Sequence, residues 1–305
     1  MKTCNLVFFI SEGEPYDLGY NLIGCKDEII KTAKSHVDNI SYYTPRILRE
    51  LGFEYFVKEY DELGCSVNPN MHKLGFETWK PLIMKLELEK LNDGDILIYR
   101  DSNTEAYPGL LMGYDKIRTF SENMLDSCKF DFFIIKDFAA DWIPNTNFVQ
   151  KSNCKTKVLR ELGENHEFSY EFPVLTANNI IVRKSLSSME LIKEWVSASQ
   201  NEKWATGLYN EYPHHEDFMY HTNGQGLINV IIANWIRKRK YDIPLDYPKF
   251  RSKCPIVIKS IFDNLMRDSI NPLKDRYLGR YIDTRGNIVE IERAENFEYL
   301  KFLEN

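Results

Sequence analysis

The stretch Gly94 to Asn103, GDILIYRDSN, contains a run from Ile96 to Tyr99 that is apolar at every position. A strand with one exposed face alternates apolar and polar side chains, whereas a strand that is apolar throughout is covered on both faces. Strands of the second kind belong to mostly parallel sheets flanked by helices. This run therefore predicts an α/β fold in which residues 96–99 form a central strand.

The segments before this run alternate between strand and helix patterns. The apolar run Cys4 to Ile10 predicts a buried first strand, and residues 25–37 have helical spacing. Thr44 and Pro45 suit the N-cap and first position of a second helix. Residues 53–60 are predicted to form a strand, and a helix is predicted to begin near Pro81 and to end at Asn-Asp-Gly.

The segments after the run continue the alternation. The patterns predict a helix over 114–125, a strand over 130–138, a strand and an amphipathic helix within 178–199, and an apolar helix over 224–240. A hairpin that turns at Arg-Gly-Asn is predicted within 280–292. We expect one domain over 1–242, with a C-terminal extension, 243–305, packed on it.

Charge and cysteine usage restrict the class of partner. The net charge is −6, so the overall field does not suggest a nucleic-acid groove, and an anionic substrate needs a local cation. The six cysteines form no CxxC pair, which favours free thiols in a reducing cytosol. The apolar run near the start is too short for a secretion signal, and no stretch is long enough to span a bilayer. We therefore expect a cytoplasmic protein.

The polar residues that follow the central strand are candidates for a metal site. Ligands in open α/β sheets bind beyond the carboxyl ends of the strands, which is where Asp101 lies. Asp101 and Asn103 share a side of an extended backbone, and oxygen donors suit hard divalent cations. A D-x-N pair is common in turns, however, and an Asx-turn is the alternative.

A longer block around this strand resembles a known family. The segment GFETWKPLIMKLELEKLNDGDILIYRD resembles the block GxGxWxWKP…L…NDGDILLYxD of GT-A-like nucleotide-sugar glycosyltransferases, which occur in polysaccharide and glycan gene clusters of bacteria and large viruses. The segments ANNIIVRKSLSSMELIKEWV and HHEDFMYHTNGQGLINVII are similar to two later blocks of that family. The resemblance covers most of the chain to about residue 240.

The resemblance implies a GT-A-like, mostly parallel sheet and a set of site residues. A divalent cation, Mn²⁺ or Mg²⁺, would be held by Asp101, Asn103 and His221. The nucleotide sugar would contact Ser11, Glu12, Lys80, Asp101, Ser102 and Gln225. Catalysis would involve Asp101, with Glu216 or Asp217 as the carboxylate near the acceptor.

Two departures from the family pattern bear on activity. Asn103 replaces an acid, and the usual His-Asp-Gln is Asn223-Gly224-Gln225, so the acid is missing at Gly224. Glu216 and Asp217 are the nearest substitutes, and His214 and His215 are others; the alternative for this segment is a solvated polar loop.

Several single residues also keep more than one interpretation. His221 suits a metal ligand, an acceptor contact or a helix cap. Trp79 suits core packing or base stacking, and Lys80 suits a phosphate contact or a structural ion pair. The basic run 237–240 suits a helix C-terminus or a lipid-linked acceptor. Four further acids near predicted element ends are unranked: Asp126, Asp131, Asp137 and Asp141.

The leading hypothesis is a metal-assisted glycosyltransferase. It would move a sugar from a UDP- or GDP-type donor to a glycan, lipid-linked or other hydroxyl acceptor. The alternative is a catalytically decayed relative that binds a sugar nucleotide or glycan without transfer. A phosphatase with Asp101 as nucleophile is disfavoured because the D-x-D-x-[TV] continuation is absent.

Overall fold

A computed structural model describes most of the chain up to residue 238. The described residues are 2–11, 22–66, 74–102, 118, 121–122, 125–126, 131–136, 149–172, 174–238, 280–282 and 288–290. They contain a sheet of five strands: β1 (Cys4–Phe9), β2 (Asn39–Tyr43), β3 (Ile96–Arg100), β4 (Phe132–Lys136) and β5 (Leu175–Arg183).

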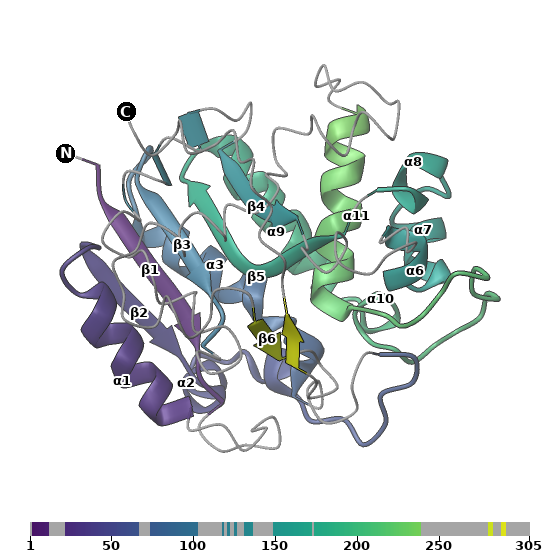
Figure 1. Ribbon diagram of the computed structural model, residues 1–305, viewed down its shortest axis with the longest axis horizontal. Helices are drawn as coiled ribbons and strands as arrows, with labels where there is room; N and C mark the ends of the chain where they lie inside the picture. Colours follow the sequence, from purple (N-terminus) through teal and green to yellow (C-terminus); the bar gives the residue numbers. More distant parts are fainter. Residues whose placement is uncertain are drawn as a thin grey trace.

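The sheet is mixed and mostly parallel, with the strand order β2-β1-β3-β5-β4 (Figure 1). β2, β1 and β3 run parallel to one another, and β5 runs antiparallel to both of its neighbours. β4 therefore points the same way as β3. The predicted α/β class with a mostly parallel central sheet is confirmed at this level.

The central strand β3 is buried on both faces, as its composition predicts. Leu97 and Tyr99 belong to the cluster of buried side chains that β3 shares with the helices on one face. Ile96 and Ile98, which alternate with them, are also buried and point to the other face. Asp101 follows in the same alternation and falls on the side of Tyr99.

Helices cover the face of the sheet to which Tyr99 points. α3 (Trp79–Lys90) packs against β1, β3 and α9 (Leu186–Ser199), and α11 (Asn223–Lys238) packs against β5 and α9. The other helices are shorter or lie nearer the rim (Figure 1): α1 (Leu22–Ala33), α2 (Pro45–Glu50), α6 (Gln150–Asn153), α7 (Thr156–Glu161), α8 (Glu167–Tyr170) and α10 (Glu202–Ala205).

Several predicted elements are present close to their expected bounds. Thr44 caps α2 by accepting a hydrogen bond from the Ile47 amide at 3.2 Å, and Pro45 is the first helical residue. The strand–helix pair in 178–199 corresponds to β5 and α9, and the strand in 130–138 to β4. The hairpin near the C-terminus is confirmed as the antiparallel pair β6 (Arg280–Ile282) and β7 (Ile288–Glu290).

Two local predictions differ from the structure, and one strand was not predicted. The predicted strand 53–60 is wrong: the segment contains the 3-10 helix η1 (Glu54–Val57), in which the adjacent residues Phe56 and Val57 are both buried. The first helix ends at Ala33, before the predicted residue 37. β2 was not predicted: it is an edge strand, and only Tyr43 of its sequence NISYY is buried. The helix over 114–125 falls largely outside the described residues.

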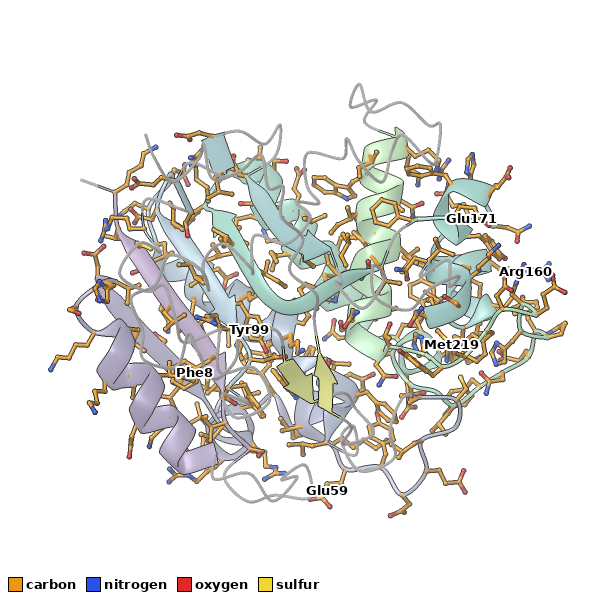
Figure 2. The ribbon with its side chains drawn as sticks, viewed as in Figure 1. Phe8, Glu59, Tyr99, Arg160, Glu171 and Met219 are labelled. Carbon is orange, nitrogen blue, oxygen red and sulfur yellow. The ribbon has the colours of Figure 1, made fainter. Side chains whose placement is uncertain are left out.

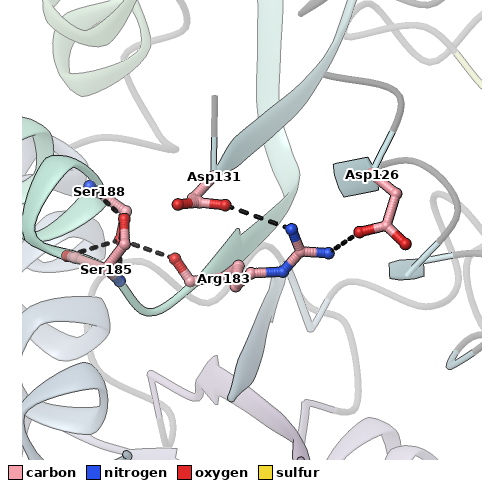
Figure 3. A network of polar contacts seen from close by, with 5 residues as sticks. All are labelled: Asp126, Asp131, Arg183, Ser185 and Ser188. Carbon is pink, nitrogen blue, oxygen red and sulfur yellow. Dashed lines mark hydrogen bonds and ion pairs between the residues drawn. The ribbon is translucent and has the colours of Figure 1, made fainter. Parts of the chain in front are cut away.

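Asp126 and Asp131 lie at the edge of the sheet where the parallel strands begin. Both are ion-paired with Arg183, the last residue of β5, and Asp131 accepts at 3.4 Å (Figure 3). Arg183 is in register with Ile96, the first residue of β3. These two acids are therefore at the opposite edge from Asp101. Asp137 and Asp141 lie outside the described residues.

At the same edge, the chain turns from β5 into α9. Ser185 caps α9 and exchanges hydrogen bonds with Ser188, whose hydroxyl also donates to the Arg183 carbonyl (Figure 3). This edge is tied together by structural contacts.

Candidate functional site

Asp101 follows β3 directly, at the edge where the parallel strands end. Its Oδ1 accepts a hydrogen bond from the hydroxyl of Tyr99 at 2.5 Å and lies 3.2 Å from Nζ of Lys80. Tyr99 itself is buried and lies near the centre of the molecule (Figure 2). The Asp101 side chain is 20% exposed, so the carboxylate is held by the protein and still reaches solvent.

Lys80 lies in the first turn of α3 and connects two carboxylates. Its Nζ is 3.2 Å from Asp101 Oδ1 and 3.0 Å from Glu77 Oε2. The side chain is 4% exposed, and its ammonium also lies 5.7 Å from the ring centre of Trp79 and 5.8 Å from that of Tyr99. Of the two interpretations of Lys80, the structure shows the ion pair.

Glu77 completes this cluster, which we call the acid–lysine triad: Glu77, Lys80 and Asp101. Glu77 lies in a turn with unusual backbone geometry, because Gly75, Phe76 and Glu77 have φ values of 60°, 49° and 61°. A left-handed conformation costs about 1–2 kcal/mol for each residue other than glycine. The fold therefore spends conformational energy to place this carboxylate beside Lys80.

Glu77 is a site residue that sequence reasoning missed. When Trp79, Lys80 and Pro81 are aligned with the WKP of the glycosyltransferase block, Glu77 stands where that block has its first tryptophan. An acid in place of this tryptophan was the sequence feature from which Glu77 could have been identified as a candidate.

The triad places two carboxylates beside one ammonium. Burial raises the pKa of Asp101, and the Glu77 carboxylate adds to this against the lowering effect of Lys80 and Tyr99. Burial lowers the pKa of Lys80, but the two carboxylates outweigh it, and that pKa lies above its ordinary value. Lys80 therefore stays protonated, whereas Asp101 is the member whose ionised form the site disfavours.

The N-terminus of α11 lies against the same turn. A Cβ on Gly224 would be 3.2 Å from the carbonyl oxygen of Glu77, and the Gly224 carbonyl accepts a hydrogen bond from Nε1 of Trp195 at 3.0 Å. The structure thus brings together the segments around Trp79, Asp101 and Gly224, which are far apart in the sequence. Gln225 is in the first turn of this helix.

Residues after β1 reach the same edge of the sheet. Ser11 follows β1, is 1% exposed, and its hydroxyl has no hydrogen-bond partner among the described residues. Trp79 is buried and stacks on Phe9 with ring centres 4.0 Å apart, so it is a core residue. Ser102 is partly exposed beside Asp101. Glu12 and Asn103 lie outside the described residues.

His221 makes structural contacts with both ring nitrogens. Nδ1 accepts from the Lys155 amide at 3.4 Å, and Nε2 lies 2.8 Å from the Trp204 carbonyl oxygen, to which it donates. The ring is fully buried. A metal ligand needs an unprotonated nitrogen with a free lone pair, which this arrangement does not provide, so our proposal does not include His221 as a ligand.

We expect His221→Phe, which keeps the volume and removes both hydrogen bonds, to lower the free energy of unfolding by about 2 kcal/mol. The Lys155 amide and the Trp204 carbonyl would be left buried without this partner. Urea denaturation measures the change. His215→Phe, in the partly exposed loop nearby, is the control and should change stability little. Equal stabilities for His221→Phe and the wild type would show that the ring is not structural.

Glu216 and Asp217 lie in an exposed loop on the side of the short helices. Asp217 pairs with Lys151 at 3.3 Å, and Lys151 also pairs with Glu171 of the α8 region at 2.8 Å. Glu171 and Met219 mark this side of the molecule in Figure 2, away from Tyr99. Among the described residues, no contact joins this loop to the triad. His214 stacks on Phe218 with ring centres 3.9 Å apart.

The described residues do not fit a divalent cation at this site. Asp101 is engaged by Lys80 and Tyr99, and His221 by two main-chain groups. Within the described ranges, no group of three or more His, Cys, Asp or Glu side chains is placed to hold a metal ion.

Comparisons of the chain with protein-family models, with curated proteins and with solved structures find no match. Among the helices of the described residues, none has both the length and the apolar composition needed to cross a bilayer.

Proposed function

We propose that the protein is a nucleotide-sugar-dependent glycosyltransferase with a GT-A-like fold. The observation that carries the proposal is the position of Asp101: a partly exposed acid that directly follows the central parallel strand, held by a lysine from the first turn of α3. Nucleotide ligands of open α/β sheets bind at this edge. The sequence resemblance supplies the reaction class.

The surroundings of Asp101 support a donor site. The buried hydroxyl of Ser11, at the same edge, has no partner among the described residues and suits a hydrogen bond to the nucleotide. The ammonium of Lys80 has three N–H donors, and carboxylates of the described residues take two of them. The third donor suits an oxygen of the donor diphosphate.

The triad also suits the charge that develops during sugar transfer. Departure of the diphosphate leaves positive, oxocarbenium-like charge on the sugar and negative charge on the leaving group, by analogy with glycoside hydrolysis. Asp101 would face the first charge and Lys80 the second. The acceptor is a hydroxyl group, and the proposal does not assign a carboxylate to activate it.

Calorimetry with UDP, GDP and CDP tests the donor site. We expect one of them to bind the wild-type protein with a dissociation constant in the micromolar range, and we expect Ser11→Val to weaken this binding because the nucleotide loses a hydrogen bond. Failure of all three nucleotides to bind would refute the proposal.

One observation favours a second candidate, a relative that binds the sugar nucleotide without transfer. The acid of the resembled family is missing at Gly224. A hydrolysis assay on sugar nucleotides separates the two candidates. Equal rates for the wild type and Asp101→Ala would favour the binding protein.

A further inference from the structure

The ammonium of Lys80 lies between the carboxylates of Glu77 and Asp101, at 3.0 Å from one and 3.2 Å from the other. At these distances the ammonium forms an ion pair with each carboxylate. The Lys80 side chain has little room to move, because it is 4% exposed and its ammonium lies beside the rings of Trp79 and Tyr99. A positive charge is thus fixed at the point where the two acids converge.

A divalent cation would compete with this ammonium for the same oxygens. Mg²⁺ and Mn²⁺ bind carboxylate oxygens at about 2.1 Å. An ion on Asp101 would therefore lie within roughly 5 Å of the Lys80 ammonium, which stays protonated. Charges of +2 and +1 at that distance repel each other strongly, because the site is largely shielded from water. His221, the other expected ligand among the described residues, is engaged at both nitrogens.

We propose that Lys80 takes the place of a divalent cation in this site: its ammonium, fixed between Glu77 and Asp101, excludes Mg²⁺ or Mn²⁺ from Asp101 and supplies the positive charge that faces the donor diphosphate. The statement about the diphosphate rests on the proposed function, whereas the exclusion of the metal does not. The ligand class that follows is a nucleoside diphosphate bound without a divalent ion.

Glu77 has a defined part in this arrangement. It is the second carboxylate that keeps Lys80 in position, and the left-handed turn from Gly75 to Glu77 points it there. Because Glu77 acts through Lys80, it is a positioning residue. Glu77→Gln should weaken nucleotide binding by less than Lys80→Met does, since the lysine keeps its bond to Asp101.

The test measures the binding of Mn²⁺ without nucleotide, and electron paramagnetic resonance detects the ion that remains free in solution. We expect the wild type and Asp101→Asn to bind Mn²⁺ equally poorly, because Asp101 is not a ligand while Lys80 is present. Lys80→Met should gain a Mn²⁺ site at least ten-fold tighter, since the ammonium that lies between the carboxylates of Glu77 and Asp101 is then removed. The double variant Lys80→Met/Asp101→Asn should lose this gain.

Two results would overturn the proposal. One is a Mn²⁺ site in the wild type that Asp101→Asn removes; the other is a folded Lys80→Met protein that gains no site. If Lys80→Met does not fold, the comparison of wild type with Asp101→Asn still decides, because it needs neither a nucleotide nor the lysine variant. Lys80→Arg, which keeps the charge, should behave as the wild type.

Nucleotide binding is measured separately, with and without EDTA. Binding that EDTA leaves unchanged supports the proposal, and binding that requires Mn²⁺ contradicts it. If no nucleotide binds under either condition, the proposed function fails, while the Mn²⁺ experiment still decides whether Lys80 excludes the metal.

Discussion

Asp101→Asn is expected to lower sugar-nucleotide turnover by at least about 100-fold and to reduce the free energy of unfolding by no more than about 1 kcal/mol. The matched control is Asp95→Asn, at the other end of the same strand. It should lower the free energy of unfolding by about 2 kcal/mol and leave turnover per folded molecule unchanged. The two acids thus have opposite expected effects.

The difference follows from what each carboxylate contacts. Asp95 accepts hydrogen bonds from the amides of Thr3 at 2.7 Å and Asn92 at 2.9 Å. Burial alone would raise the pKa of Asp95, but these bonds outweigh it and the pKa lies below the ordinary value. Ionised Asp95 therefore stabilises the fold at neutral pH, and this contribution is lost as the pH falls through its folded-state pKa.

The ionisation of Asp101 changes stability with pH in the opposite direction. Its pKa is raised in the folded state, so its contribution to stability is present at low pH and is lost as the pH rises through that pKa. Ionisation of Asp101 adds a negative charge beside that of Glu77. Replacing Asp101 with asparagine removes that charge, while Lys80 keeps its bond to Glu77.

Urea denaturation and a hydrolysis assay at pH 7 measure the two effects on the same protein samples. A loss of stability in Asp101→Asn as large as that in Asp95→Asn would show that Asp101 is a structural acid. Unchanged turnover in Asp101→Asn would remove it from the reaction.

Lys155→Met is expected to remove a rise in stability of about 2.5 kcal/mol between pH 7 and pH 10. Lys155 is fully buried, and its Nζ donates to the main-chain oxygens of Thr206 and Leu208, the latter at 2.7 Å. Burial lowers the pKa of Lys155 from its ordinary value to about 8. Below this pH Lys155 is protonated in both the folded and the unfolded protein, and burial of its charge lowers the stability of the folded state by its full amount.

The sign of the effect follows from proton binding. Above pH 8 the folded protein releases the proton while the unfolded chain, with an ordinary lysine pKa, still holds it. Stability therefore rises with pH through this window. Methionine has a similar length and no charge, so the variant lacks this contribution.

The measurement is the difference in free energy of unfolding between wild type and variant at pH 7 and at pH 10, which cancels most tyrosine and cysteine titrations. Lys34→Met, at an exposed position after α1, is the control and should show no pH-dependent difference. If the difference in free energy of unfolding between the wild type and Lys155→Met is the same at pH 7 and at pH 10, burial does not lower the pKa of Lys155.

The sequence predicted the elements whose apolar pattern reports directly on burial. β1 and β3 are apolar at nearly every position, and α9 and α11 carry apolar faces, so their burial and their type could be predicted. β2 could not be found in this way, because an edge strand needs no apolar face and takes its partner from β1 alone. The 3-10 helix η1 was misread because two adjacent apolar residues fit both patterns.

The place of Asp101 in the fold was predictable, and its contacts were less so. The apolar run 96–99 predicted a central strand, and Asp101 follows that strand at the edge where the parallel strands end. Lys80, the partner of Asp101, is also held by Glu77. Glu77 is the last of three successive residues with left-handed backbone conformation, and such a turn has no periodic pattern in the sequence. The bonds of His221 come from residues 155 and 204, which only the folded chain brings next to it.

The close approach of Gly224 to Glu77 also limits how this chain can change over evolutionary time. A side chain at position 224 would begin 3.2 Å from the Glu77 carbonyl oxygen, so α11 or the turn would have to shift to admit it. An aspartate introduced at position 224 would therefore disturb Glu77 and, through Lys80, Asp101. Positions 77 and 224 are expected to vary together among descendants of this sequence, each restricting what the other tolerates.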